Sequence, residues 1–258
     1  MPTITLLEKA YRSFGQQLFQ ARLTSLCKDL KVEAKVAGRT GRDWVQVELI
    51  GEDQKVALGF LDREIGLAPV SIDKVKRFST IKGKVIFAGE KEQDLSVDIG
   101  VYSPRVYDAT ISLERLQAQL ADGKKLPLRR VIELFCLYDL MPLHVKITSD
   151  AKPEHEQVEA ELSEAQFSQF VQWINSSLDR LIVLGATVSQ VEQAITVSGH
   201  NRDIIRVETL GLLEHAVICK LGTDAIGLMP KLGPHLYKAI LAPFSPRKIR
   251  QAITRPFF

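Results

Sequence analysis

The chain has 258 residues, of which 45% are hydrophobic and 25% are charged. This balance is that of a globular protein and excludes a disordered or fibrous chain. The formal net charge of +3 is too mild to establish a nucleic-acid partner, so the distribution of the cations matters more than their total.

The three cysteines, Cys27, Cys136 and Cys219, are widely spaced and lie in apolar stretches. An odd number at such spacing disfavours a disulfide framework and indicates a reducing compartment, with each thiol acting as a small core residue. No apolar run approaches the roughly 20 residues of a membrane span, and no N-terminal secretion signal is recognisable. We therefore expect a cytoplasmic protein without a membrane partner.

Residues 1–78 are expected to form a small α/β unit with elements in the order β-α-β-β-α. Residues 3–7 suit a strand, and the stretch 11–30 has helical spacing. Two alternating strands follow around a turn at 38–42, and a second helix runs from Gly51 to Gly66. The expected buried face of the first helix consists of Phe14, Leu18, Ala21, Leu26 and Leu30. Units of this order resemble ferredoxin-like and KH-type folds, which serve many functions.

Residues 79–149 carry the most specific pattern in the chain. A strand begins with the letters GKV at 83–85, a second strand contains VDIG at 97–100, and a third leads into IS at 111–112 and a short helix. Residues 142–147 supply a closing strand. This segment resembles the S1 class of OB barrels, in which glycines at the ends of curved strands let a short sheet roll and close. The resemblance implies an RNA-binding barrel.

The resemblance departs from its pattern at the positions that stack on nucleic-acid bases. Such barrels usually hold single strands with aromatic side chains on the middle strands. Here those positions are Ser96 and Thr110, while Phe87, Tyr102 and Tyr107 lie on the first strand and in a loop. We therefore expect phosphate contacts to dominate, with salt-sensitive binding of low sequence specificity. The alternative is that the barrel's cations form an ordinary solvated face.

Two further basic segments extend this interface. One surrounds a Gly/Pro turn at 123–127, and the other alternates cations with apolar residues from 244 to the Pro-Phe-Phe end at 256–258. The first can also be a solubilising turn, and the second can fold back on its own core or insert into a partner protein. The expected nucleic-acid-binding residues are Lys82, Lys84, Arg105, Tyr107, Arg115, Lys124, Lys125, Arg129, Arg130, Arg247, Lys248 and Arg250.

Residues 150–258 are expected to form a C-terminal α/β unit after a polar linker at 150–156. The pattern predicts strands at 158–162, 181–184, 204–207 and 214–219 and helices from Ser163 and over 188–195. A strand at 224–227 and a helix at 236–241 complete the unit. Because DATI at 108–111 and DAIG at 224–227 follow similar patterns, we expect a degenerate second barrel-like segment here.

The residue types of a nucleophilic site occur at Cys219, His200, Asp203 and His215. His215 and Cys219 lie on one strand about 13 Å apart at a rise of about 3.3 Å per residue, which disfavours direct contact. The histidines lack zinc spacings, and the glycines around Thr223 lack the pattern of a phosphate loop. No cofactor or metal is therefore expected.

The strings VDIG, LERLQAQLADGK and GTDAIGL are similar to an archaeal family of uncharacterised proteins, a resemblance that implies no activity. Three hypotheses follow for this α+β, multi-domain chain. The first is a non-catalytic accessory protein of translation, RNA processing or transcription that binds ribosomal or other structured RNA. The second is a protein-interaction scaffold, within a protein complex, that does not touch RNA. The third is an enzyme with a site near His200, Asp203 and His215.

Overall fold

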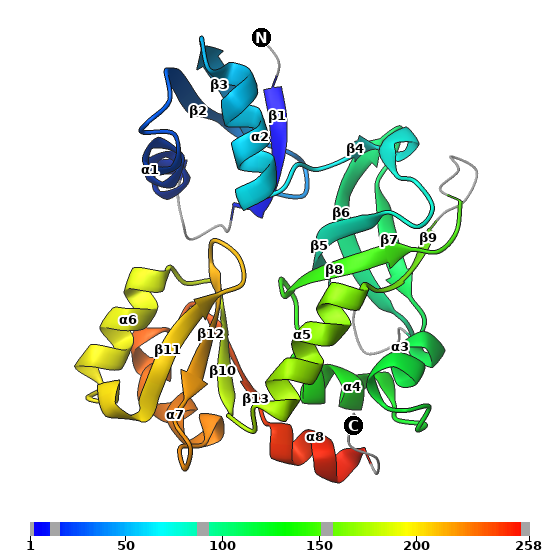
Figure 1. Ribbon diagram of the computed structural model, residues 1–258, viewed down its shortest axis with the longest axis vertical. Coiled ribbons are helices and arrows are strands. Elements are labelled where there is room, and N and C mark those ends of the chain that lie inside the picture. The colour runs from blue at the N-terminus through cyan, green and yellow to red at the C-terminus, as the bar shows by residue number, and fades with distance from the viewer. Residues whose placement is uncertain (1–2, 11–15, 87–92, 151–156, 254–258) are drawn as a thin grey trace. The chain divides into compact units, whose positions relative to one another are not determined.

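The computed structural model describes residues 3–10, 16–86, 93–150 and 157–253 (Figure 1). It is a mixed α+β protein that divides into two compact units. Unit 1 consists of Met1–Lys74 and Ile99–Tyr107, and unit 2 consists of Val75–Asp98 and Asp108–Phe258. The chain passes from unit 1 to unit 2 after Lys74, returns to unit 1 inside strand β6 (Leu95–Ser103), and enters unit 2 again at the start of β7 (Tyr107–Ile111).

An antiparallel sheet in the order β1-β3-β2 forms the centre of unit 1. Its elements are β1 (Thr3–Lys9), α1 (Gln16–Leu26), β2 (Val32–Arg39), β3 (Trp44–Gly51) and α2 (Gln54–Glu64), followed by the short β4 (Val70–Ser71) and the 3-10 turn η1 (Ile72–Lys74). The predicted β-α-β-β-α order is confirmed.

The buried face of α1 differs from the predicted one. Phe19, Leu23 and Cys27 are buried, a set spaced four residues apart as one face of a helix requires. Ala21, which was expected in the core, is exposed, and Phe14 lies outside the described residues. The core of unit 1 is therefore built on a different helical register from the one that the spacing indicated.

A closed five-stranded barrel is built mainly from the first part of unit 2, while Ile99–Ser103 of β6 and Tyr107 are assigned to unit 1. Its strands are β5 (Thr80–Ile86), β6, β7, β8 (Pro142–Ile147) and β9 (Val158–Leu162). The pairings run β6-β5-β8-β9-β7 and close through β6 and β7; the β7–β9 pair is parallel, while β5–β6, β5–β8 and β8–β9 are antiparallel. The inner face is apolar, with Val85, Val97, Ile111 and Val145 at most 1% exposed.

Two features of the barrel differ from the prediction. The closing strand β9 comes from residues 158–162, beyond the expected boundary at Ser149 and within the segment assigned to the C-terminal unit. In addition, two helices, α3 (Leu113–Leu120) and α4 (Leu128–Phe135), separate β7 from β8, and the second begins within the basic run rather than after it. The expected linker at 150–156 lies outside the described residues except for Asp150.

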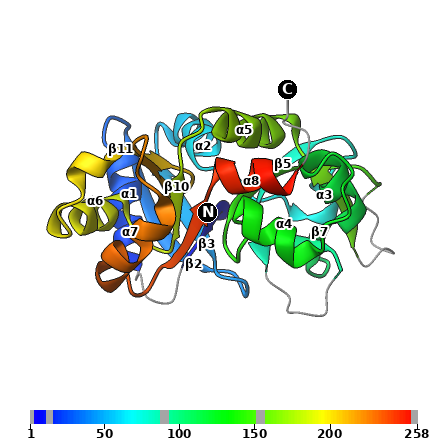
Figure 2. The ribbon, with the colours of Figure 1, turned by 90° about the horizontal axis from the view of Figure 1, so that it is seen from below.

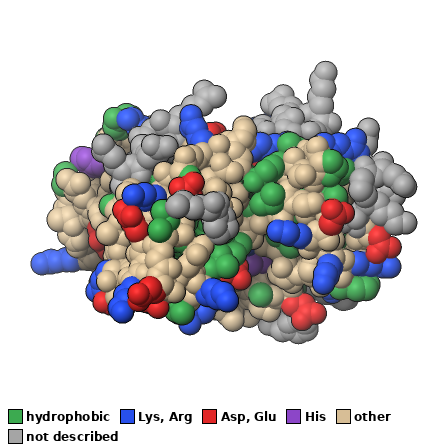
Figure 3. Space-filling model, turned by 90° about the horizontal axis from the view of Figure 1, so that it is seen from above, with side chains coloured by type: hydrophobic (Ala, Val, Ile, Leu, Met, Phe, Trp, Pro, Cys, Tyr) green, Lys and Arg blue, Asp and Glu red, His purple; other side chains and the backbone are tan. Residues whose placement is uncertain are grey.

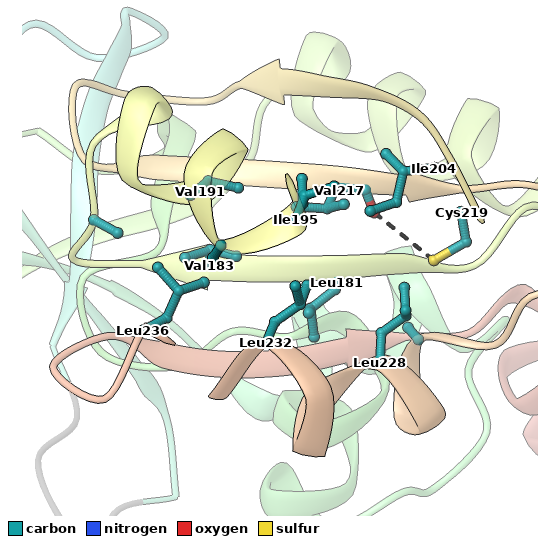
Figure 4. Packing of buried hydrophobic residues seen from close by; sticks show 13 residues of the cluster. Leu181, Val183, Val191, Ile195, Ile204, Val217, Cys219, Leu228, Leu232 and Leu236 are labelled. Carbon is teal, nitrogen blue, oxygen red and sulfur yellow. Dashed lines mark hydrogen bonds between the residues drawn. The ribbon is translucent and has the colours of Figure 1, made fainter. Parts of the chain in front are cut away.

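The C-terminal part of unit 2 is an antiparallel sheet of four strands in the order β11-β12-β10-β13. Its elements are α5 (Glu164–Asn175), β10 (Arg180–Leu184), α6 (Val188–Val197), η2 (Asn201–Asp203), β11 (Ile204–Thr209), β12 (Glu214–Cys219), α7 (Ala225–Leu232), η3 (Gly233–His235), β13 (Ile240–Phe244) and α8 (Pro246–Ala252). Leucine and valine side chains from β10 and β12 pack against α6 and α7 on one face (Figure 4).

The second barrel-like segment was predicted wrongly. The four-stranded sheet is open, because β11 and β13 are its edges among the described residues. Asp224 begins a helix rather than a strand, since its side chain accepts the backbone N–H of Gly227 at 2.7 Å as an N-cap. The helix expected at 236–241 is absent from those described residues: the segment follows the 3-10 turn η3, forms a turn and enters β13 at Ile240.

An aromatic cluster joins the barrel and the four-stranded sheet within unit 2. Phe170 of α5 lies 5.5 Å from Phe135 of α4, 5.9 Å from Trp173 and 6.4 Å from Phe244 of β13, measured between ring centroids. All four side chains are buried. Edge-to-face and offset contacts of this kind stabilise a core beyond the burial of area alone. Helices α4 and α5 are therefore fixed against the sheet rather than appended to it.

Candidate nucleic-acid interface

Two residues of the expected interface are in the interior. Lys84 is 0% exposed, and its Nζ lies 2.6 Å from Oε2 of Glu214, which is also 0% exposed. Tyr107 is 1% exposed. Neither side chain can reach a polyanion, so both predictions are corrected: Lys84 is a structural cation and Tyr107 is a core aromatic.

Strand alternation explains the position of Lys84. Gly83 and Val85 point into the barrel, so Lys82 and Lys84 point outward. At Lys84 the outward direction points toward β12, because Glu214 of β12 forms an ion pair with Lys84 there. The strand pattern correctly excludes Lys84 from the barrel's interior, but the outside of a barrel is solvent only where no other element covers it.

The remaining barrel cations are engaged with neighbouring side chains. Arg115 contacts Glu161 at 3.5 Å and Glu159 at 3.7 Å, and Lys146 contacts Glu161 at 3.3 Å. Lys82 is half-buried opposite His144; burial, and then the charge of Lys82, lower the pKa of that imidazole. The outer barrel surface around Arg115 therefore carries balanced charge rather than an excess of cations.

Arg105 is exposed in the turn between β6 and β7, within unit 1. Its guanidinium lies 5.1 Å from the centroid of the Tyr107 ring, a cation-π contact that holds the side chain over its own strand. Arg105 is thus available to solvent, but it belongs to a different unit from the other predicted cations.

A concentration of exposed cations occurs on unit 2, on α4, α8 and the loop between α3 and α4. These elements lie side by side in both views (Figures 1 and 2). We call the following set the basic surface: Lys124, Lys125, Arg129, Arg130, Arg247, Lys248 and Arg250. By contrast, cationic and anionic side chains are interspersed over the face drawn in Figure 3, as on an ordinary solvated surface.

Local sequence dictates why these cations face outward. Helix α4 buries Val131, Leu134 and Phe135 along one face, which leaves Arg129 and Arg130 on the other. Helix α8 begins at Pro246, a residue suited to the first helical position, and buries Ile249. In both helices, the apolar side sets the direction of the charged side.

Hydrogen bonds fix the C-terminal turn of α8 in place. Arg250 donates to the backbone oxygen of Ile174 at 2.6 Å and to Oγ of Ser177 at 2.9 Å, at the end of α5. Lys124 donates from Nζ to the backbone oxygen of Ala252 at 2.6 Å, which ties the α3–α4 loop to the end of α8. Cations at helix C-termini complement the carbonyls that lack partners there.

The cations of the basic surface differ in their availability. Arg129 and Arg130 both contact Glu133, at 3.3 Å and 3.2 Å. Lys125, Arg247 and Lys248 are exposed and form no ion pair with another described residue. We therefore regard these three as the cations best placed to contact phosphate.

The residues of the alternative enzyme hypothesis are not brought together. His200 Nδ1 lies 2.7 Å from Asp203 Oδ2, next to the end of β12 that carries Cys219. His215 lies opposite Thr209 at the other end of the strand, where its Nε2 is 3.0 Å from the backbone oxygen of Ala186. The His200–Asp203 pair is a local contact three residues apart, and His215 is a core histidine.

Burial also makes the cysteines poor nucleophiles. Burial, and then the charges of Asp179 and Asp224, raise the pKa of Cys219 from 9.0 to about 12, and burial raises the pKa of Cys136. In the native protein at pH 8, both thiols should react with a disulfide reagent far more slowly than after unfolding in urea. A fast native reaction at either residue would contradict this burial.

The same thiols make stability depend on pH. Because an unfolded thiol ionises near its ordinary value while the native one stays protonated, unfolding releases protons above about pH 9. The free energy of unfolding should therefore decrease as the pH rises from about 9 toward 12. A serine or alanine variant at Cys219 should show a weaker decrease over this interval in urea titrations.

Within the described residues, no three His, Cys, Asp or Glu side chains are arranged to hold a metal ion. No helix in that part of the chain has the length and apolar character required to cross a bilayer.

These observations define a mixed α+β protein in which a closed five-stranded barrel is joined to an open antiparallel sheet. Residues 178–242 match the family model described as DUF2110 C-terminal domain, a domain of uncharacterised function. The match covers β10 to β12, α6, α7 and the beginning of β13. No curated protein matches the chain. The S1-like and archaeal resemblances are not among these matches and stay predictions.

Proposed function

We propose that this protein binds RNA and acts as a non-catalytic accessory factor in translation, RNA processing or transcription. The observation that carries the proposal is the basic surface, where two segments distant in sequence, residues 124–130 and 247–250, place exposed cations together on unit 2. Phosphate contacts of this kind give affinity that falls steeply with salt and depends little on sequence.

The barrel adds a second line of support. Numbered from β5, its strands follow the order 1-2-3-5-4 with closure of 1 to 4 and a parallel pair between 3 and 5. This is the arrangement of an OB-type Greek-key barrel, a scaffold that commonly holds oligonucleotides. We infer an S1-like barrel from this order together with the GKV and VDIG strands.

Charge reversal tests the basic surface directly. In the triple variant Lys125→Glu, Arg247→Glu and Lys248→Glu, we expect RNA affinity at low salt to fall by about 10- to 100-fold. The slope of log affinity against log salt should become shallower by about two units, because fewer counterions are released. Filter binding of a labelled structured RNA across a salt series measures both quantities.

A matched control separates a local interface from overall charge. The variant Arg22→Glu, Lys28→Glu and Lys55→Glu reverses three exposed cations of unit 1 and changes the net charge equally. It should keep most of the affinity and the original slope. An equal loss of RNA affinity in the two variants would show that the basic surface is not the binding site. If the unaltered chain does not bind RNA at low salt, RNA binding itself is refuted. Partners retained from nuclease-treated lysate would then favour the scaffold.

A further inference from the structure

Residues 76–80 form a basic and aromatic turn on the barrel that the proposed function does not use. Lys76, Arg77 and Phe78 are consecutive exposed residues immediately before β5. Phe78 is 64% exposed, although burial of a phenylalanine ring is strongly favoured. An exposed ring flanked by two cations therefore calls for a physical explanation.

The backbone holds Phe78 in a conformation that a bulky residue rarely adopts. Its φ is 66°, in the left-handed region, which is an outlier for an aromatic residue. Such conformations persist where the surroundings enforce them, and they concentrate at functional sites. The ring is thus directed by the backbone and does not result from a loose end of chain.

Hydrogen bonds to the end of β8 and within the turn enforce this geometry. The N–H of Phe78 donates to the oxygen of Ile147 at 2.8 Å, and the N–H of Ile147 donates to the oxygen of Ser79 at 3.0 Å. The Ser79 hydroxyl donates to the oxygen of Lys76 at 2.6 Å. The β5–β8 ladder is therefore continued through the turn, and Phe78 is presented on a rigid edge.

Arg77 is fixed beside the ring. Its Nε donates to the backbone oxygen of Thr148 at 3.0 Å, and its guanidinium carbon lies 4.7 Å from the centroid of the Phe78 ring. A planar cation next to an exposed aromatic face is the combination that proteins use for single-stranded nucleic acid, where the ring stacks on a base and the cation meets the phosphate.

We propose that Arg77 and Phe78 form a stacking subsite for one unpaired base of a structured RNA. This subsite rests on the proposed RNA binding and supplies the stacking that Ser96 and Thr110 cannot provide. It lies at the β5–β8 edge of the barrel rather than on its middle strands. The basic surface binds phosphate irrespective of sequence, and the subsite adds a preference for RNA with an accessible base.

Substitution of Phe78 separates stacking from charge. For Phe78→Leu, we expect binding of a labelled single-stranded RNA to weaken about tenfold, with the salt slope unchanged because no charge is altered. Binding of a blunt RNA duplex, which offers no unpaired base, should not change. Phe78→Trp should keep the affinity for the single strand, and the fluorescence of the introduced indole should be quenched on binding.

Tyr237→Leu is the matched control, because Tyr237 is another aromatic residue, 78% exposed, beside a cation, with Lys238 Nζ 5.6 Å from its ring centroid. This variant should bind both RNAs as the unaltered chain does. If Phe78→Leu binds the single strand with unchanged affinity while the unaltered chain binds RNA, the subsite is overturned and the basic surface stands. If the unaltered chain binds neither RNA, both proposals fail.

Discussion

Lys84→Met should lower the free energy of unfolding of unit 2 by about 3–5 kcal/mol. Lys84 and Glu214 form an ion pair in which both side chains are 0% exposed. Removing the ammonium leaves the Glu214 carboxylate in the interior without its counter-ion, next to Asp98, the buried cross-strand neighbour of Lys84. A buried carboxylate without a counter-ion lowers the free energy of unfolding far more than the loss of one contact at the surface does. Urea titration followed by circular dichroism measures the difference.

The double variant Lys84→Met with Glu214→Leu separates the effect of the unpaired charge from that of packing. Replacing both members of a buried pair by apolar side chains of similar volume is often neutral or stabilising. We therefore expect the double variant to regain the part of the loss that comes from the Glu214 carboxylate, while the buried Asp98 beside position 84 keeps the remainder. If both single and double variants are equally unstable, packing at these positions outweighs the charge; if Lys84→Met is as stable as the unaltered chain, the carboxylate is not buried against the barrel.

Phe170→Ala should destabilise unit 2 by about 3–5 kcal/mol. The ring lies within 6.4 Å of three other aromatic rings, and truncation leaves a cavity between α4, α5 and β13. Because these elements connect the barrel to the four-stranded sheet, both parts should lose stability together. Unfolding would be monitored by tryptophan fluorescence in a Trp44→Phe background, where Trp173 is the single remaining tryptophan.

The control for this variant is Tyr237→Ala, which removes an exposed aromatic side chain and should change stability by less than about 0.5 kcal/mol. The shape of the transition is informative as well. If tryptophan fluorescence and circular dichroism give the same single unfolding transition, the barrel and the four-stranded sheet unfold together, as a joined structure should. Two separated transitions would contradict the role of the aromatic cluster as a connection.

Local patterns predicted many elements of the fold. The alternation in β2 and β3 and the GKV and VDIG strands set the positions of the N-terminal sheet and of the barrel strands. Pairing between distant segments was not accessible in the same way. The sequence pattern correctly predicted a strand at residues 158–162, but nothing in that pattern shows that this strand pairs with β7 and β8.

The candidate interface was predictable to a similar degree. Exposure of Lys125, Arg247 and Lys248 agrees with the basic runs in the sequence, whereas their proximity depends on α8 packing beside α4. Lys84 could not be separated from Lys82, since both alternate outward and only tertiary structure covers one of them. At residues 224–227 a strand was predicted where helix α7 begins, because short polar residues such as Asp224 occur both as helix N-caps and before strands.

The sequence reasoning overlooked Phe78, although a signal was present. Lys76-Arg77-Phe78 combines two cations with an aromatic residue directly before a glycine-containing strand. The segment fell at the end of the expected N-terminal unit, next to the boundary with the barrel, and was therefore given no role in either. Its exposure and its left-handed backbone emerge only from the structure.

The ion pair between Lys84 and Glu214 also limits how the matched segment can be studied in isolation. Excised as a fragment, residues 178–242 would keep the face packed by α6 and α7 but lose the barrel, α5 and Phe244 from the opposite face. That face would then present Ile182, Ala216 and Ala242 to water around an orphaned Glu214 carboxylate. The family signature therefore marks a stretch of sequence that depends on the rest of unit 2, not an autonomous folding module.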